Sequence, residues 1–464
     1  MASFLARGPR VNAAAIDSPL VRAIFSPEII EPLCRAAGHR WRRSFWSPTL
    51  TLTAFLLQVL DAAKTLRAAV AIILTQHAAG RRAGDPSADP AAYCQARMRL
   101  PLRVFEALRD TIAAQGQRLL DAARLWRSRR VWIVDGSSAS MPDTPALQQE
   151  FPQPPGQKAG CGFPVAQLVG LFDWASGMIA DVVIDSIRPH ELPLFRKLWH
   201  HFQPGDIVLN DRAYCAYVDL VRLKQRDVDC VTRLHQRRAL DRRTATKLGP
   251  DDWQTTWTRP KRWHESTGVT QAEFDALPAT LPIRILRVTQ MPPGFRSRTV
   301  WIATTLLDPI AFPADAIRAL HRDRWTIELN FRSLKISLGM DVLRGHSPDV
   351  VRKEIAMHLA AYNLLRLLMW QAARQRGRDP RRLSFAGTLH RLRCVLPLWL
   401  LLRDLAPNGA AALLARLPGW IADDLVPARP NRLEPRRRKR RPKQFTLLQK
   451  PRAWYRTNGD PDAR

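Results

Sequence analysis

The 464-residue sequence predicts an α/β protein in which a mixed sheet with flanking helices follows an all-helical region. Three observations support this class. Hydrophobic periodicity changes from the helical to the strand type near residue 129. Three consecutive strand-like runs are then followed by alternating helices and strands over 130–232. Acidic residues stand directly after two of the short apolar runs, as they do where strands end at a functional edge of a sheet.

Residues 1–125 are expected to form the all-helical N-terminal domain. Ser26, Pro27 and Glu28 indicate a helix start, because Ser caps a helix, Pro fits its first position and an acid complements its dipole. This helix is expected to end near Gly38. Further helices are expected at 49–78, 91–100 and 102–125, with a linker at 78–90.

The central region is expected to run from 126 to 376. Its first three strands form a meander and are followed by helix–strand alternation, which is the order of an RNase H-like core. The segment 233–310 is expected to be a β-rich insertion, with short β-like runs at 281–289 and 298–306. The core strands are expected at 130–135, 165–173, 178–187, 206–210 and 228–232, with a loop at 141–164 and helices at 191–202 and 214–226.

The C-terminal part is expected to be helical and then basic. Helices are expected at 323–338 and 349–376, each ending at a glycine, and a Leu-rich helical region, a candidate for dimerisation, at 377–428. The tail, 429–464, has 13 Lys/Arg against 3 Asp/Glu and is expected to be disordered.

Charge narrows the classes of partner. The formal net charge of +31 favours a polyanion, with nucleic acid as the first candidate. No membrane partner is expected, because the apolar span 50–74 contains three charged residues and the N-terminus lacks a signal peptide. Six cysteines without metal-binding spacing indicate a reduced, cytoplasmic protein. The run 39–46, HRWRRSFW, interleaves cations and aromatics, which suits phosphate contact or a solvated loop.

Three acids stand where a fold can converge carboxylates on divalent metal ions. Asp135 follows the apolar run 131–134, and Asp211 follows 207–210. Glu328 lies on the expected helix between two cations at helical spacing, which alone also fits a solvated ion-pair face. Three other acids are rival candidates for metal ligands on sequence grounds: Asp173, Asp181 and Asp185. The turn expected in DWASG is a sufficient structural reason for Asp173.

Together these residues resemble the bacterial D-D-E transposases of the insertion-sequence-four family. Arg324, Glu328 and Lys335 match the signature Tyr-x2-Arg-x3-Glu-x6-Lys, while His321 stands where relatives have Tyr. The resemblance includes Asp135 in VDGSS and the Asp-Arg pair in LNDRAYC, and it covers roughly 125–370.

The resemblance implies that Asp135, Asp211 and Glu328 are catalytic and hold two Mg²⁺ ions, for which Mn²⁺ substitutes. Arg324 and Lys335 would bind phosphates, and His321 would replace the phosphate contact of a tyrosine. Arg212 is a further candidate for DNA contact. Trp301 would stack on a flipped base, although it equally fits the core face of a strand.

The implied activity is cut-and-paste transposition of an insertion sequence. The protein would bind the terminal inverted repeats, nick them to expose a 3′-OH, form a hairpin and join the end to target DNA. Residues 1–125 would bind the DNA end or only cap the fold. A homodimer on paired ends is expected, in the cytoplasm of a bacterium and on the nucleoid when DNA is bound.

Two other classes of function remain open at this point. One is a catalytically inactive DNA-binding regulator derived from a transposase, which would bind without cutting. The other is a stand-alone nuclease on the same core, which would cut without joining. The complete set of three acids disfavours the first, and the Arg/Lys signature with the long insertion disfavours the second.

Overall fold

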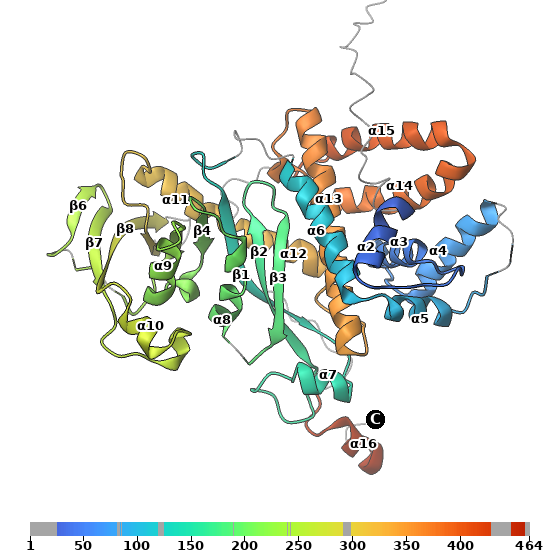
Figure 1. The fold of residues 1–464 in the computed structure, drawn as a ribbon, viewed down its shortest axis with the longest axis horizontal. Coiled ribbons are helices and arrows are strands. Elements are labelled where there is room, and N and C mark those ends of the chain that lie inside the picture. The colour runs from blue at the N-terminus through green and yellow to red at the C-terminus, as the bar shows by residue number, and fades with distance from the viewer. Residues whose placement is uncertain are drawn as a thin grey trace, which may run out of the picture. The chain divides into compact units, whose positions relative to one another are not determined.

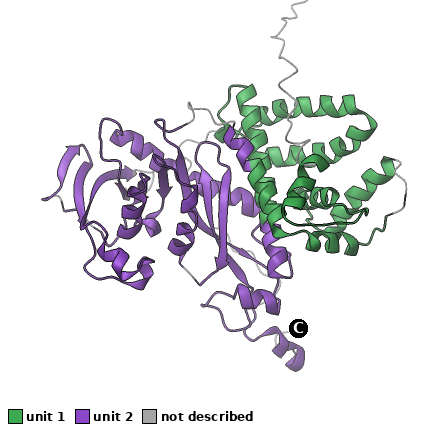
Figure 2. Cartoon of the chain, in the orientation of Figure 1, with its two compact units in different colours: residues 1–112, 356–426 green, residues 113–355, 427–464 purple. Residues whose placement is uncertain are grey.

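The computed structural model describes residues 26–80, 84, 86–118, 125–188, 190–238, 240–241, 243–290, 298–427 and 447–459. The chain divides into two compact units (Figure 2). Unit 1 comprises Met1–Ile112 and Ala356–Val426, and unit 2 comprises Ala113–Ile355 and Pro427–Arg464. Unit 1 therefore contains both the N-terminal helices and the helical region 356–426, while the sheet lies in unit 2. The expected domain boundaries stay predictions.

Unit 1 is helical, as expected. The first helix that the structure describes, α2, begins at Pro27 after Ser26, which confirms the predicted start. The helices that lie wholly or partly in this unit are α2 (Pro27–Ala36), α3 (Pro48–Leu60), α4 (Leu66–Ala79), α5 (Ala91–Arg99), α6 (Leu102–Arg118), α13 (Pro348–Gln375), α14 (Phe385–Leu405) and α15 (Pro407–Asp423). The last residues of the expected helix 102–125 lie partly outside the described residues.

The single helix expected at 49–78 is wrong, because the chain breaks between α3 and α4. The Asp61 carboxylate accepts the backbone N–H groups of Ala63 and Lys64, which competes with helix continuation. Lys64 adopts a positive φ of 55°, and the Thr65 side chain caps α4. α3 is buried along most of its length, as expected of a packed helix.

One described helix, α14, is long and apolar enough to cross a membrane by length and composition. Of its apolar window, 44% is buried, and the helix packs against α3, α4 and α15 within unit 1. A single helix of this kind is weak evidence for a membrane span, because core helices of folded domains pass the same test.

Unit 2 contains a nine-stranded mixed sheet in the order β3-β2-β1-β4-β5-β9-β8-β7-β6 (Figure 1). β1 pairs antiparallel with β2 and parallel with β4, and β5 continues parallel to β4. β9 to β6 continue the same sheet, so the insertion extends the core. The strands are β1 (Val131–Ser140), β2 (Val165–Asp173), β3 (Ile179–Ser186), β4 (Ile207–Asn210), β5 (Asp229–Arg233), β6 (Thr246–Gly249), β7 (Asp252–Thr258), β8 (Thr280–Gln290) and β9 (Arg298–Thr304).

The mixed sheet and the meander are confirmed, but several boundaries are wrong. β1 continues to Ser140, since it forms a long hairpin with β2. The loop 141–164 contains the short helix α7 (Pro145–Glu150), which Thr144 caps.

Three expected helices are shorter or broken. α8 (Glu191–Arg196) is followed by the 3₁₀ turn η3 (Trp199–His201), and η4 (Arg212–Tyr214) precedes α9 (Tyr217–Lys224). The expected helix 323–338 is instead α12 (Thr326–Arg332) followed by the π-helical turn η6 (Ser333–Ser337), and a separate helix, α11 (Ala314–Asp323), precedes them. The insertion also holds η5 (Glu265–Thr267) and α10 (Gln271–Asp275), and η7 (Pro380–Arg382) precedes α14.

Part of the tail is ordered, contrary to the expectation of disorder throughout 429–464. α16 spans Arg452–Asn458. Lys158 donates a 2.9 Å hydrogen bond to Gln449, and Gly160 lies against Pro451, so this segment contacts the loop 141–164 within unit 2. The densest basic run, 436–443, lies outside the described residues.

Candidate active site

The register of two parallel strands sets Asp135 and Asp211 at the same level. Ile133 on β1 pairs directly with Leu209 on β4, and each acid stands two residues further along its chain. Side chains along an extended strand alternate between its two faces, so residues two positions apart lie on the same face. Asp135 therefore lies on the face of Ile133, and Asp211 on the face of Leu209. Asp211 is itself extended and precedes η4.

Glu328 reaches this edge because α12 packs on β1. Phe331 on α12 meets Phe172 on β2 with ring centroids 5.2 Å apart. The ring also lies over Gly170, where a Cβ would stand 3.0 Å from it. Gly170 is the residue on β2 that pairs with Asp135. The glycine thus lets α12 approach the sheet beside the first acid.

Arg324 lies between two of the acids. Its guanidinium is 4.0 Å from Asp135 Oδ2 and 3.8 Å from Glu328 Oε1, and its side chain is 15% exposed. At about 4 Å and an effective dielectric constant of 20, such a pair attracts by about 4 kcal/mol. Burial nevertheless raises the pKa of Asp135 to about 6, opposed by the Gly136 N–H and Arg324 and aided by Glu191 and Asp211. Desolvation of the Asp135 carboxylate therefore affects its pKa more than the attraction of Arg324 does.

The Asp211 side chain has one oxygen atom that is available to bind a further group. Its Oδ1 is buried and has no hydrogen-bond partner among the residues that the structure describes. A buried, unsatisfied carboxylate oxygen is costly unless a further group binds it. The Asp211 backbone carbonyl accepts a hydrogen bond from Thr232 on β5, which holds the strand end in place.

Glu191 is a further acid at the site that the sequence analysis missed. It opens α8, accepts a 2.9 Å hydrogen bond from the Tyr214 hydroxyl and raises the pKa of Asp135. A Cβ on Gly136 would lie 1.9 Å from its Oε1. In the sequence, Glu191 has only the signature of an acid in a first helical turn, so its tertiary position had no local signal.

His321 lies on α11 next to the site. Its Nε2 is buried without a partner in the described part of the chain. Burial lowers its pKa to about 4, and Arg324 and Arg233 add to this while Asp211 opposes it. The imidazole is therefore neutral near pH 7 and keeps one N–H to donate.

Lys335 lies in the π-helical turn that follows α12. The turn is defined by the Leu338 N–H, which bonds the Ser333 carbonyl 3.0 Å away. Single π turns within helices are frequent at functional sites. Lys335 is half-buried and forms no ion pair with any residue that the structure describes.

The other two predicted DNA contacts are not part of this cluster. Arg212 is exposed, and its guanidinium donates a 2.7 Å hydrogen bond to Gln236. Trp301 is half-buried in β9, with its ring 5.8 Å from that of Trp253, and it packs against the core of unit 2. Their roles in DNA binding stay predictions.

The family comparison decides the class of protein. The profile described as Transposase DDE domain matches residues 126–364. The chain belongs to the DDE transposases. The match extends over both strand-end acids, α11 and α12, so the resemblance to the insertion-sequence-four family is confirmed.

The chain is also similar to two individual transposases. The chain is 24% identical over 374 residues to the transposase InsG for insertion sequence element IS4 of Escherichia coli strain K12, covering 79% of this chain and 80% of that one. It is also similar to the piggyBac transposase in a synaptic complex with hairpin DNA, at 8% identity and a TM-score of 0.41, covering 86% of this chain and 84% of that one.

As a DDE transposase, the protein depends on divalent metal ions for its chemistry. The residues present fit such ions. Several carboxylates converge at one sheet edge, and the Asp211 Oδ1 is a buried oxygen without a donor among the described residues.

The rival acids are used elsewhere. Asp173 pairs with Arg130 and accepts hydrogen bonds from Ser176, which closes the predicted turn. Asp185 pairs with Lys197. These two acids are therefore held by structural partners.

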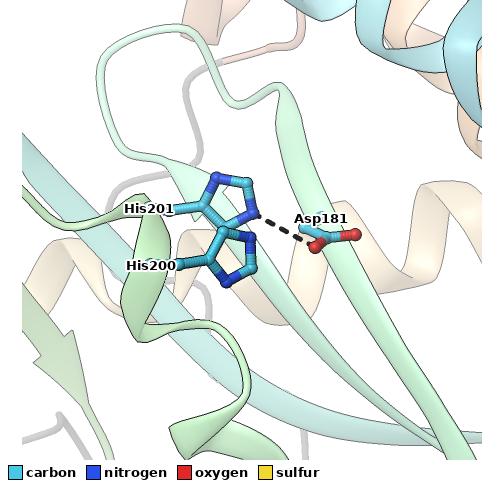
Figure 3. Close-up of side chains that lie close together, drawn as sticks. All are labelled: Asp181, His200 and His201. Carbon is cyan, nitrogen blue, oxygen red and sulfur yellow. Dashed lines mark hydrogen bonds and ion pairs between the residues drawn. The ribbon is translucent and has the colours of Figure 1, made fainter.

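A second group of donors lies on β3 and η3. Asp181, His200 and His201 have ligand atoms within 4.8 Å of one another (Figure 3). His201 Nε2 is 3.1 Å from Asp181, and His200 Nδ1 is 2.8 Å from the Lys197 carbonyl. Two nitrogen donors suit transition metals rather than Mg²⁺, so this group does not replace the carboxylate site.

Proposed function

We propose that this transposase catalyses cut-and-paste transposition of an insertion sequence, with Asp135, Asp211 and Glu328 as the catalytic set. The observation that carries the proposal is the parallel register of β1 and β4, with α12 packed on β1. It draws together two strand-end acids and a helix acid that are separated by nearly 200 positions in the sequence.

The same three carboxylates would hold two Mg²⁺ ions, with Mn²⁺ as a substitute. Bound ions of this kind activate the attacking hydroxyl and stabilise the leaving oxygen. Several carboxylates are needed because two divalent ions repel each other strongly. An RNase H-like arrangement of the sheet is part of this proposal.

Cations and a neutral histidine would position the DNA. Arg324 and Lys335 suit the phosphates beside the cut, the first as a planar fork and the second as a point charge. His321 would donate its N–H to a phosphate oxygen. Arg212 and Trp301 stay as candidates for more distant contacts, the tryptophan by stacking on a flipped base.

Each step is the same displacement at phosphorus with a different nucleophile. Water attacks first, a bond from its oxygen to phosphorus forms, and the 3′-oxygen leaves as a hydroxyl. That 3′-OH then attacks a phosphorus of the opposite strand, displaces the 3′-oxygen of the flanking DNA and forms a hairpin, which water reopens. The freed 3′-OH finally attacks target DNA and displaces another 3′-oxygen. One acidic set serves every step.

The remaining parts of the proposal concern assembly. The helical residues 1–125 would bind the terminal inverted repeats, and 377–428 would contribute to a homodimer on paired ends. Target DNA would be the second duplex. The protein would act in the bacterial cytoplasm, on the nucleoid when bound to DNA.

The test uses a labelled duplex that carries the element's own end, with Mg²⁺ or Mn²⁺, and compares the wild type with Glu328→Ala. We expect nicked, hairpin and joined products from the wild type. Loss of a metal-ligating carboxylate should reduce them by about 100-fold or more, with binding retained. Gel analysis of products and a mobility shift on the same samples measure both.

Two results would contradict the proposal. Binding without product from the wild type under either metal would indicate an inactive DNA-binding derivative. Cutting without strand joining would indicate a nuclease.

A further inference from the structure

Unit 1 contains a basic hollow of about 540 Å³ between the segment 39–48 and the C-terminal end of α5. Four arginines line it, and the lining residues include no Asp or Glu. We call it the arginine hollow. Its cations are Arg40, Arg42, Arg43 and Arg99, and its aromatic walls are Trp41 and Trp46.

The charge of the arginine hollow is not neutralised within the described part of the chain. Arg40, Arg42 and Arg43 are exposed and form no ion pair or hydrogen bond with any described residue. Arg99 donates to the Gln95 carbonyl on its own helix, 3.3 Å away. Four like charges around one hollow repel each other, which an anion would relieve.

The walls of the hollow are held in place. Trp41 stacks on His39, with centroids 5.8 Å apart and 13° between planes, and the Arg35 guanidinium lies 5.6 Å from its ring. Trp46 packs against the buried Tyr93 at 5.0 Å. Because both aromatic rings already have neighbours, they act as rigid walls and leave the cations to bind.

The N-terminus of α3 adds to the positive field. This helix has 13 residues and begins at Pro48, which lines the hollow. The partial positive charge of a helix N-terminus favours an anion there. Arg99 also contributes to a lowered pKa of His39, after burial, as expected where cations crowd together.

We propose that the arginine hollow binds the phosphodiester backbone of DNA. This proposal rests on the proposed function in one respect, the identity of the polyanion as DNA. Phosphate contacts of this kind give affinity and fix orientation but read no sequence.

The test replaces three cations at once, in Arg40→Gln/Arg42→Gln/Arg43→Gln, and measures duplex affinity by fluorescence anisotropy without metal at several salt concentrations. Each lost phosphate contact lowers the slope of log affinity against log salt by about 0.9. We expect a slope smaller by about 2.7 and a uniform loss of affinity across sequences. Thermal unfolding should be unchanged, because these side chains are exposed.

The matched control is Arg374→Gln/Arg376→Gln/Arg378→Gln, which removes three exposed arginines from the same unit. It should change the slope by much less. An equal loss in both triple variants, or no loss in the first, would overturn the proposal. Since no metal is present, these outcomes are independent of whether the protein cuts DNA.

A second inference comes from Glu191, and a different set of contacts carries it. One oxygen, Oε2, accepts the Tyr214 hydroxyl at 2.9 Å. The other, Oε1, occupies the space that a side chain at Gly136 would fill, directly after Asp135. The carboxylate is thus held at one oxygen and directed beside the first acid with the other.

We infer that Glu191 supplies a fourth carboxylate to the metal centre, through Oε1, while Tyr214 positions it. The inference depends on the proposed set of Asp135, Asp211 and Glu328. A fourth anionic ligand would further reduce the repulsion between two divalent ions.

The test measures Mn²⁺ binding to the DNA-free protein by electron paramagnetic resonance and calorimetry. We expect Glu191→Gln to weaken Mn²⁺ binding by about 10- to 100-fold, the range seen when groups that support a metal site are lost. Tyr214→Phe should weaken it less, since it frees the carboxylate without removing it. Glu265→Gln, an exposed glutamate in the same unit, is the control and should have no effect.

Unchanged Mn²⁺ affinity in Glu191→Gln would overturn this inference. If that variant does not fold, Glu191→Asp keeps the charge on a shorter side chain and should give an intermediate affinity. If the separate variants Glu191→Asp and Tyr214→Phe both bind Mn²⁺ with wild-type affinity, that result also overturns the inference. Loss of Mn²⁺ binding in Glu191→Gln with normal DNA cleavage would instead contradict the proposed catalytic set.

Discussion

At the scale of single residues, the site balances burial against charge. Asp135 is close enough to Arg324 for attraction, yet its pKa rises to about 6 because the carboxylate is desolvated and two other acids lie near it. His321 shows the reverse case, since burial and Arg324 lower its pKa to about 4. The two groups respond to pH in opposite directions.

We predict that metal binding to the DNA-free protein releases a proton from Asp135 below about pH 6. The folded pKa, about 6, exceeds the ordinary value of 3.8, so the metal-free native state binds the proton more tightly than the unfolded chain. Its contribution to stability is greatest below pH 3.8 and is lost as pH rises through 6. Metal affinity should therefore increase from pH 5 to 7, which calorimetry in buffers of different ionisation enthalpy measures. In Asp135→Asn the residual affinity should lose this pH dependence.

We predict the opposite trend for His321. Its folded pKa of about 4 lies below the ordinary 6.5, so the unfolded chain binds the proton more tightly. Stability from this residue is present above pH 6.5 and is lost as pH falls toward 4. Urea unfolding of metal-free His321→Asn should show a flatter dependence on pH over this window than the wild type. An unchanged dependence would mean that His321 is solvated in the native state.

At the scale of elements, the helical segment 314–337, which contains Glu328, is not one regular α-helix. Between α11 and α12 the backbone tightens, because the N–H groups of Arg324, Trp325 and Ile327 bond carbonyls three residues back. After Arg332 it widens into the π turn. These two changes rotate Arg324 and Lys335 about Glu328 relative to a regular helix, which adjusts how the three side chains face the strands.

We predict that Gly170→Ala displaces α12 from the sheet. The added Cβ would lie 2.9 Å from the Phe172 ring and 3.0 Å from the Phe331 ring. Phe331 lies on α12, the helix that also holds Glu328. Overpacking of this kind costs about 1–3 kcal/mol. DNA cleavage should fall by more than stability alone explains, as cleavage rates and thermal unfolding on the same samples would show.

The matched control is Gly249→Ala in β6, where a Cβ would meet no atom within 4 Å. It should leave both cleavage and unfolding unchanged. If Gly170→Ala cleaves normally, the packing of Phe331 does not set the position of Glu328.

At the scale of the whole molecule, positive charge is spread well beyond the catalytic site. Residues 429–464 contribute 13 cations against 3 acids, a net +10 of the total +31. Such a segment attracts DNA without choosing a sequence. Charge of this kind governs the rate and salt dependence of association more than the chemistry that follows.

We predict that changing the seven Lys and Arg residues of 436–443 to Gln weakens non-specific duplex binding strongly. The slope of log affinity against log salt should fall by up to about 6, at about 0.9 for each lost contact. Single-turnover cleavage at saturating DNA should be unaffected, because the carboxylate centre is unchanged. Reduced cleavage at saturation would mean that the basic run takes part in the reaction.

The sequence predicted the class of core and the acids on local grounds. The runs before Asp135 and Asp211 are short, apolar and β-branched, so they identify buried strands whatever the rest of the chain does. The helix start with the strong local signal Ser26-Pro27 was predicted correctly. The single helix at 49–78 was wrong because hydrophobic periodicity continues across a break that the Asp61 side chain makes.

The sequence by itself determined that this is a DDE transposase, because the chemistry needs particular residue types at particular spacings along the chain. Only the tertiary structure decided which acids meet. The pairing of β1 with β4 aligns Asp135 with Asp211, and Gly170 admits the helix of Glu328. Glu191 joins them through a hydrogen bond from Tyr214, 23 positions away. Convergence depends on strand register and packing between distant segments, which local periodicity does not encode.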